Sequence, residues 1–241
     1  MNIQSSATAA ATTTTTTDNE HNLPVFIFEG LIATGKSTLL QKLQLRNPTW
    51  CIFLEPVEDW QRGDLLSNFY KNPALYCFTL QQRVFDSYEN IYRTARALAS
   101  IDSSTPILIE RSSRAAFRIF TKLARDNNNL TIANYISLNE QYFRNFYSFD
   151  LNVQTIYLRI PPLKAFERML SRNRPEEVQF LSRNYMSQLH ALHEKEFTLP
   201  NSNFKAPLVI LDGNFDSLND AHLTWLENLI KQTIRPNATS D

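Results

Sequence analysis

Five short apolar runs alternate along the chain with stretches of helical spacing. The runs are rich in β-branched or aromatic residues and lie at 25–28, 51–54, 107–109, 155–158 and 208–211. Such uninterrupted apolar runs are typical of strands that are buried on both faces. Apolar positions at helical spacing fill the segments between them, at 36–46, 73–99, 112–125, 131–148, 162–173, 178–197 and 218–234. The alternation predicts an α/β fold of three layers, in which helices cover both faces of a parallel sheet.

Charged side chains follow all five apolar runs. They are Glu29, Glu55, Glu110 with Arg111, Arg159, and Asp212. One such charge could be ordinary helix capping or solvent exposure. Ligands of open parallel sheets bind beyond the carboxyl ends of the strands, however, and charges after all five runs indicate a polar catalytic mouth there.

The N-terminal segment differs in composition from the rest of the chain. Residues 1–23 are poor in large apolar side chains and contain a threonine run. Such a segment cannot bury enough surface to offset chain entropy, so we expect a disordered low-complexity tail at 1–23 and one folded domain at 24–241. The tail has neither the basic start and apolar core of a secretory signal nor any arginine, which favours a cytoplasmic location.

Composition narrows the expected partners. The 24 Lys and Arg residues equal the 24 Asp and Glu residues, so no basic field favours nucleic acid, and a small-molecule acceptor is expected. No run approaches the roughly 18 apolar residues of a membrane helix, so no membrane partner is expected. Cys51 and Cys77 lie in strand and helix patterns without metal-ligand spacing, which favours core thiols in a reducing compartment.

The segment 30–37 reads GLIATGKS and lies between a predicted strand and a predicted helix. It matches the phosphate-binding pattern GxxxxGK[ST], whose glycines let the backbone N–H groups surround phosphates. Lys36 would contact the β- and γ-phosphates, and Ser37 would hold Mg²⁺. The pattern predicts binding of a nucleotide such as ATP with Mg²⁺ but leaves the reaction open, and its candidate residues are Gly30, Ala33, Thr34, Gly35, Lys36, Ser37 and Thr38.

Two strand ends carry candidate catalytic groups. Glu55, in the stretch LEPVEDW, could act as a general base for an acceptor hydroxyl or could simply cap the next helix. Glu110 occupies the place of an acid that serves Mg²⁺, directly or through water. Arg111 could neutralise charge on a transferring phosphate, and the alternative is an ordinary salt bridge at the end of the strand.

Two further segments have both a structural and a functional interpretation. Arg168, Arg172 and Arg174 cluster beside Pro175, as a solvated basic face or as a mobile lid near 168–178 that closes over phosphates. The stretch 69–90 is unusually aromatic, and aromatics at helical spacing usually form a core. An amide in such a stretch, here that of Gln81, can pair a donor and an acceptor with a nucleobase edge.

The order of these motifs resembles that of the animal-type deoxyribonucleoside kinases, the family of deoxycytidine kinase and mitochondrial thymidine kinase. The shared series is the phosphate loop, EPVxxW, an aromatic segment with glutamine, ERS, the arginine lid and a helix of LHxLHE type, from about Val25 to Leu211. The resemblance implies a P-loop kinase fold with a five-stranded parallel sheet, a homodimer, and transfer of the γ-phosphate of ATP to a deoxynucleoside 5′-hydroxyl in nucleotide salvage.

The resemblance also implies roles for single residues. Glu55 matches the general base, Arg111 the arginine near the 5′-hydroxyl, and Glu110 the acid serving Mg²⁺. On the acceptor side, Trp60 matches a residue that walls the nucleoside site, and Tyr70 and Glu177 match the pair that binds the 3′-hydroxyl. Gln81 matches the residue that pairs with the base, and Phe120 matches the aromatic ring that stacks on it. On the donor side, the matches are the lid residues Arg168, Arg172 and Arg174 and, near the adenine, Asp212, Asn214 and Phe215.

Three departures from the family pattern bear on the site. Ala33 replaces a usual glycine, which is harmless only if its φ is negative. The stretch after ERS carries Ala115 and Phe117, with arginines at 114 and 118, so its local packing is in question. Tyr88, Val84 and Ala116 should surround the 5-position of the base, and together they favour pyrimidine nucleosides, thymidine and deoxycytidine first.

Two other functions fit part of the pattern. A thymidylate kinase would share the loop and the fold, but its phosphorylated acceptor favours an arginine where this chain has Glu55. A nucleotide switch without catalysis would need no acceptor pocket and would leave Tyr70, Gln81, Phe120 and Glu177 without a role.

Overall fold

The computed structural model describes residues 23–199, 204–212 and 215–234. Its centre is a sheet of five parallel strands in the order β2-β3-β1-β4-β5. The strands are β1 (Val25–Gly30), β2 (Cys51–Phe53), β3 (Ile107–Glu110), β4 (Gln154–Leu158) and β5 (Val209–Leu211). All five predicted strands and the α/β fold of three layers are confirmed, whereas the predicted tail lies almost wholly outside the described residues.

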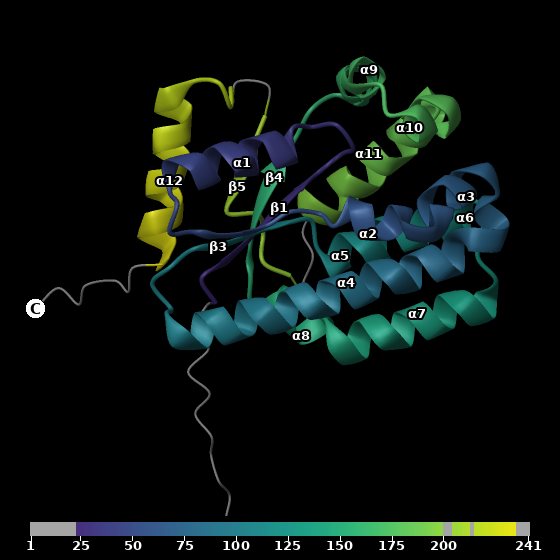
Figure 1. Ribbon diagram of the computed structural model, residues 1–241, viewed down its shortest axis with the longest axis horizontal. Helices are drawn as coiled ribbons and strands as arrows, with labels where there is room; N and C mark the ends of the chain where they lie inside the picture. The colour runs from purple at the N-terminus through teal and green to yellow at the C-terminus, as the bar shows by residue number, and fades with distance from the viewer. Residues whose placement is uncertain (1–22, 200–203, 213–214, 235–241) are drawn as a thin grey trace, which may run out of the picture.

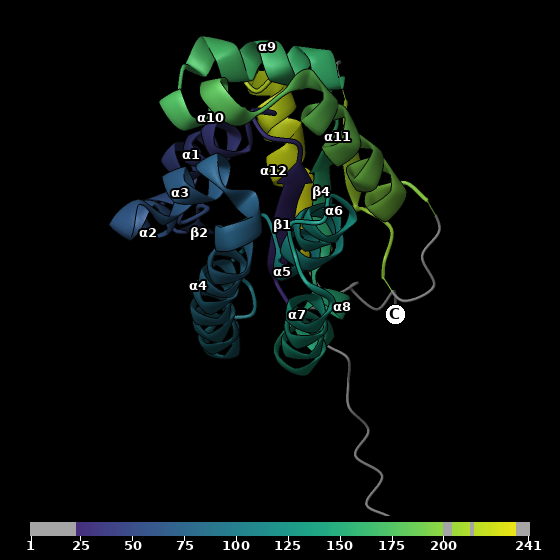
Figure 2. The same cartoon turned by 90° about the vertical axis from the view of Figure 1, so that its right-hand side faces the viewer.

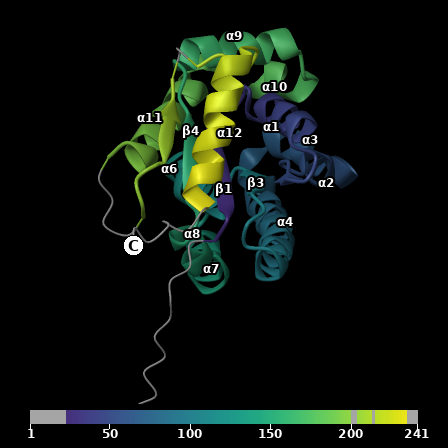
Figure 3. The same ribbon diagram turned by 90° about the vertical axis from the view of Figure 1, so that its left-hand side faces the viewer.

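Two helices cover one face of the sheet. They are α1 (Lys36–Arg46) and α12 (Asp220–Ile234), which lie side by side in front of the strands in Figure 3. Their apolar residues pack against alternate positions of β1, and the buried cluster includes Phe26, Phe28, Leu39, Leu40, Leu108, Ile156, Leu226 and Ile230. Burial of both faces explains why β1 is apolar without alternation.

The other face is covered by a larger group of helices. The long α4 (Pro73–Ile101) crosses it beside α7 (Ile132–Asn145), as Figure 1 shows. Val25 and Ile27 of β1 face this layer, together with Phe85 and Tyr142. The layer continues through α5 (Ser113–Ala115), the π-helical turn η2 (Ala116–Thr121), α6 (Lys122–Asp126), α8 (Tyr147–Leu151) and α11 (Arg183–Phe197).

Short helices lie at the carboxyl edge of the sheet, where the site was expected. In Figure 2, α9 (Pro162–Arg172) and α10 (Pro175–Phe180) lie above the strands. On the acceptor side are α2 (Val57–Gln61), the 3₁₀ turn η1 (Arg62–Asp64) and α3 (Leu65–Lys71). The apolar pattern did not predict α2 and α3, because helices of this length carry too few periodic positions.

Three predicted helices are interrupted. The segment 112–125 contains η2, and the segment 131–148 ends at Asn145 and resumes as α8. The segment 178–197 was wrongly predicted as one helix, because Ser182 caps a new helix by accepting a hydrogen bond from the Tyr185 N–H. Pro175 occupies the first turn of α10, where its missing N–H costs nothing.

Both cysteines are free thiols, and Cys77 is buried in the core. In the described part of the chain, no helix has both the length and the apolar content to cross a membrane.

Candidate active site

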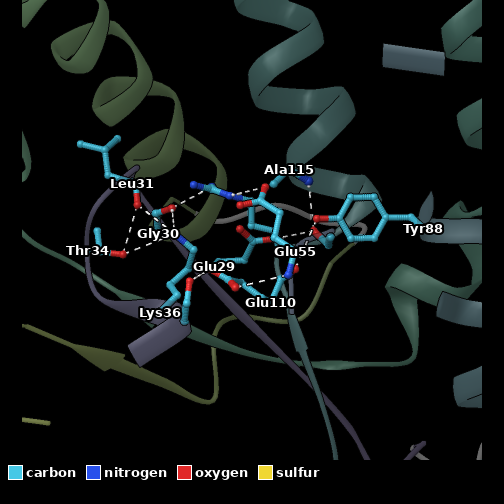
Figure 4. Close-up of polar contacts among 12 residues, drawn as sticks. Glu29, Gly30, Leu31, Thr34, Lys36, Glu55, Tyr88, Glu110 and Ala115 are labelled. Atoms are coloured by element: carbon cyan, nitrogen blue, oxygen red, sulfur yellow. Dashed lines mark hydrogen bonds and ion pairs between the residues drawn. The ribbon is translucent and has the colours of Figure 1, made fainter. Parts of the chain in front are cut away.

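The loop between β1 and α1 wraps around one amino group. Lys36 is the first residue of α1 and is 4% exposed. Its Nζ donates hydrogen bonds to the carbonyl oxygens of Gly30, at 3.1 Å, and Leu31, at 2.9 Å (Figure 4). Burial lowers the pKa of Lys36 to about 8, and Arg111 adds to this shift. A Cβ at Gly30 would meet the Leu158 carbonyl oxygen at 2.5 Å, so the close approach of β1 and β4 requires glycine.

Ala33 adopts the left-handed conformation, with φ 61°. The replacement of glycine is therefore not harmless, because an L-residue pays roughly 1–2 kcal/mol for this geometry. The strain lies in the loop itself, four residues before Ser37.

Glu110 joins the loop to the second strand end. Its Oε1 accepts a hydrogen bond of 2.7 Å from the Ser37 hydroxyl, and its Oε2 accepts one of 3.3 Å from the Glu55 N–H. The carbonyl oxygen of Glu110 accepts a hydrogen bond from the Tyr88 hydroxyl at 3.3 Å (Figure 4). The two residues expected to serve Mg²⁺ are thus adjacent.

Arg111 connects the loop, the candidate base and the aromatic wall. Its φ is 63°, and its Nη1 donates to the Gly30 carbonyl oxygen at 2.8 Å. Its Nε forms an ion pair with Glu55 Oε1 at 3.0 Å, and its guanidinium lies 5.0 Å from the centre of the Phe120 ring. A left-handed arginine with these three contacts indicates a position constrained by the site rather than by the strand.

Glu29 is a buried acid that sequence reasoning noted only as a strand end. It is 0% exposed, and its Oε1 accepts a hydrogen bond of 2.5 Å from the Ser112 hydroxyl. Burial raises the pKa of Glu29 to about 7, against the opposing effects of Arg111 and the Ser112 hydrogen bond. Glu29 therefore adds negative charge beside Arg111 only where it is ionised, above about pH 7.

One cavity of about 1080 Å³ joins the loop to the aromatic side of the molecule. Its lining includes nearly every candidate residue of both sides, namely Ala33, Thr34, Gly35, Lys36, Ser37, Thr38, Glu55, Trp60, Tyr70, Gln81, Val84, Tyr88, Glu110, Arg111, Ala116, Phe120, Arg168, Arg172, Arg174 and Glu177. Gly30 takes part through its carbonyl oxygen alone.

Hydrogen bonds and a ring contact fix the side chains on the aromatic side of this cavity. Trp60 Nε1 donates to the Ser87 hydroxyl at 3.1 Å, and the Gln81 amide meets the Thr121 hydroxyl at 3.1 Å. The Tyr70 ring stacks on Phe180 with centroids 6.3 Å apart. Phe180 belongs to α10, so the acceptor wall touches the arginine segment.

The arginine segment lies over the loop, but its arginines differ in their contacts. Arg168 Nη1 donates to the Thr34 carbonyl oxygen at 3.2 Å. Arg172 and Arg174 form ion pairs with Glu177, which is 8% exposed. Glu177 therefore lies at the cavity wall as a partner of the two arginines, which sequence reasoning did not anticipate.

A smaller cavity of about 100 Å³ adjoins the loop on the other side. Asp212 and Phe215 line it together with Thr34 and Arg168, which also line the larger cavity, so the two cavities meet at the loop. Asn214, predicted beside them, lies outside the described residues.

The unusual stretch after ERS is well packed. Arg114 and Arg118 both form ion pairs of 2.7 Å with Glu196, and the Arg114 guanidinium lies 4.0 Å from the centre of the Phe204 ring. The displaced arginines thus anchor α11 and do not enter the cavity.

Sequence reasoning missed several residues of the cavity wall, including Ile32, Leu80, Asn127, Tyr185, Asp216 and Ser217. Tyr185 comes from the helix start that the pattern did not resolve, and a capping signal at Ser182 could have indicated it. Ile32 is an unspecified position of the phosphate-binding pattern, and the remaining residues belong to no motif with a chemical role.

Comparison with known proteins agrees with this geometry. Residues 26–235 match the model of the deoxynucleoside kinase family. A fowlpox virus protein named "Probable deoxycytidine kinase" is 30% identical over 203 residues, 80% of each chain. Chicken deoxycytidine kinase 2 is 26% identical, and the match covers 80% of this chain and 83% of the relative. The thymidine kinase of ictalurid herpesvirus 1 is 29% identical, and the match covers 70% of this chain and 72% of the relative. The match over nearly the whole described chain shows that this protein belongs to the deoxynucleoside kinase family.

Proposed function

We propose that this kinase transfers the γ-phosphoryl group of ATP to the 5′-hydroxyl of a pyrimidine deoxynucleoside. The observation that carries the proposal is the single cavity lined by both the loop 33–38 and the residues Gln81 and Phe120. A phosphate bound at the loop and a base at the aromatic wall would share one cavity. Glu55 and Arg111 line the same space, so the candidate base and its arginine would face both ligands.

The donor side combines fixed cations and hydrogen-bond donors. Lys36 and the lid residue Arg168 would stabilise charge on the transferring phosphate, and Asp212 and Phe215 would border the adenine in the smaller cavity. Ser37 and Glu110 are the hard oxygen donors that Mg²⁺ prefers, and one carboxylate beside phosphates is its usual setting. When bound, the ion would neutralise phosphate charge.

The acceptor side contains the groups that a hydroxyl nucleophile requires. The Glu55 carboxylate would accept the proton of the 5′-hydroxyl, while Arg111 holds that carboxylate in place through their ion pair. Gln81 would pair with the base and Phe120 would stack on it, with Trp60 as a wall. Tyr70 and Glu177 would contact the 3′-hydroxyl.

The preference for pyrimidines rests on three residues of the cavity wall. Tyr88 is 1% exposed and fixed by its hydrogen bond to the Glu110 carbonyl oxygen, so it cannot easily move aside for a larger base. Val84 and Ala116 complete this part of the wall. A panel of the four natural deoxynucleosides should give the highest kcat/KM with thymidine or deoxycytidine, and a purine as the best substrate would contradict the assignment.

The role of Glu55 can be tested without disturbing the binding site. Glu55→Gln keeps the shape of the side chain but removes the base, so kcat should fall by 10² or more while nucleoside binding stays within a few fold. Asp126, paired with Lys122 on the surface of α6 and outside the cavity lining, offers a control in Asp126→Asn. Unchanged kcat in Glu55→Gln would exclude Glu55 as the base.

We also propose that the protein forms a homodimer through α7. Ile132, Ile136 and Phe143 lie on one side of this helix at helical spacing and are 64%, 50% and 48% exposed. An apolar stripe of this kind fits a second copy of the chain. Analytical ultracentrifugation should give a dimer, and Ile136→Asp should give a monomer. A monomeric wild-type protein at micromolar concentration would contradict the proposal.

A further inference from the structure

The hydroxyl of Thr121 lies directly behind the Gln81 amide. Thr121 is the last residue of η2 and is 0% exposed, and it does not line the cavity. Its Oγ1 lies 3.1 Å from Gln81 Oε1 and 2.9 Å from the Ala116 carbonyl oxygen. Gln81 itself lines the cavity, so Thr121 can act on a ligand only through this amide.

The Thr121 hydroxyl cannot donate a hydrogen bond to both oxygens at once. A hydroxyl has one hydrogen, whereas both neighbouring atoms are carbonyl oxygens in this arrangement. The oxygen and nitrogen of a glutamine amide have nearly the same shape, and only hydrogen bonding decides between the two orientations. Either the hydrogen goes to Gln81 Oε1, or it goes to the Ala116 carbonyl oxygen and the amide turns its Nε2 toward Thr121.

The Gln81 amide can hydrogen-bond to the Thr121 hydroxyl in either orientation, because the Ala116 carbonyl oxygen offers a second acceptor for the hydroxyl hydrogen. When Gln81 presents oxygen, Thr121 donates to it. When Gln81 presents nitrogen, Thr121 accepts from it and donates to Ala116. Ser87 already makes the second arrangement on α4, since its hydroxyl accepts from Trp60 Nε1 at 3.1 Å and donates to the Arg83 carbonyl oxygen at 2.9 Å.

The two orientations correspond to two kinds of pyrimidine edge. Thymine has a donor at N3 and an acceptor at O4, whereas cytosine has an acceptor at N3 and a donor at N4. An amide that pairs with both positions must therefore turn over to exchange one base for the other. A neighbour able only to donate, or only to accept, would hold the amide in one orientation and reject one of the two bases.

We propose that Thr121 is a positioning residue that lets Gln81 pair with either pyrimidine edge and thereby sets the breadth of base recognition. This inference rests on the proposed function, because it assumes that Gln81 contacts the base. Thr121 supplies a hydrogen-bond partner for both amide orientations, and the Ala116 carbonyl oxygen takes the hydroxyl hydrogen when the amide presents nitrogen.

The test compares thymidine with 5-methyl-2′-deoxycytidine, which differ only along the edge that Gln81 would contact. The ratio of their kcat/KM values is measured for the wild-type enzyme, Thr121→Val, Thr121→Ala and Thr121→Ser. Valine preserves the shape of threonine, alanine relieves any crowding, and serine keeps the hydroxyl. Because two variants lack the hydroxyl, the comparison can still be made if one of them fails to fold.

The wild-type enzyme should use both nucleosides with kcat/KM values within about tenfold of each other. Without the hydroxyl, an amide nitrogen facing residue 121 would be left buried and unpaired, which costs more than an unpaired carbonyl oxygen. Thr121→Val and Thr121→Ala should therefore shift the ratio in the same direction, by roughly fivefold or more. Thr121→Ser should keep the ratio within about twofold of the wild-type value.

Three results would overturn the inference. They are a wild-type preference beyond about 100-fold, an unchanged ratio in both variants without the hydroxyl, and an equal shift in Thr121→Ser. Failure of the proposed function would look different, because the wild-type enzyme would then phosphorylate neither nucleoside.

Discussion

Replacement of Arg111 by methionine should destabilise the protein in a way that depends on pH. Arg111 is 5% exposed, and its guanidinium contacts Glu55 and the Gly30 carbonyl oxygen and interacts electrostatically with Glu29. Arg111→Met keeps most of the side-chain volume but leaves these groups without their partner. Removal of one member of a buried ion pair costs about 3–5 kcal/mol, and loss of the hydrogen bond to Gly30 contributes about 1 kcal/mol of this.

Glu29 determines the sign of the pH dependence. Its pKa in the folded protein is raised to about 7 from an ordinary value of 4.5, mainly by burial, so it is largely neutral below about pH 6. Below that pH, Arg111 has no Glu29 charge to balance, and the variant loses only the contacts with Glu55 and Gly30. As the pH rises above 7, Glu29 ionises in the wild-type protein beside Arg111, and the loss in free energy of unfolding grows.

Urea unfolding followed by circular dichroism at pH 5.5 and pH 8.5 measures this difference. Arg62→Met is the matched control, because the Arg62 side chain is 74% exposed and pairs with Asp59 at the surface. The control should lose about 1 kcal/mol or less at both pH values. An Arg111→Met loss below about 1 kcal/mol, or one that is equal at the two pH values, would refute the reasoning.

Two further predictions concern the loop between β1 and α1. Ala33→Gly relieves the left-handed strain but gives the unfolded chain more freedom, so the free energy of unfolding should rise by about 0.5–1 kcal/mol. Ala115→Gly, at a right-handed buried helical position, should lower it by about 1 kcal/mol, and a loss at both sites would contradict the strain at Ala33. Lys36→Met should lower kcat/KM by roughly 10³, measured by ADP release, because it removes the cation facing the phosphates. The surface variant Lys122→Met should stay near the wild-type value, and comparable rates for the two variants would contradict that role.

The sheet was predictable because each strand coincides with a short apolar run. The expected burial on both faces holds for β1 and β3, whereas the edge strands β2 and β5 are only partly buried and Ile210 is 39% exposed. The helix break at Ser182 was not predictable, because the apolar spacing of 178–197 continues across it and only the capping hydroxyl marks the boundary. The loop and strand-end candidates were predictable because parallel strands end at one edge of the sheet, which brings Lys36, Glu55 and Glu110 together.

The contacts and backbone geometry of several site residues could not be predicted from the sequence. Nothing in the spacing of RNRPEE indicates that Glu177 pairs with both Arg172 and Arg174, since the turn at Asn173 sets that geometry. Thr121 carries no motif, and its role depends on a π-helical turn that places its hydroxyl behind Gln81. The left-handed φ of Ala33 likewise follows from the fold of the loop rather than from its residue type.

The most direct test of the proposed function is ADP release by the wild-type enzyme with MgATP and either thymidine or thymidine 5′-monophosphate, in parallel. The account predicts turnover with thymidine and little with the monophosphate, because the Glu55 carboxylate in the acceptor cavity repels a second anion. Faster ADP release with the monophosphate would contradict the account and would identify a nucleotide, rather than a nucleoside hydroxyl, as the acceptor.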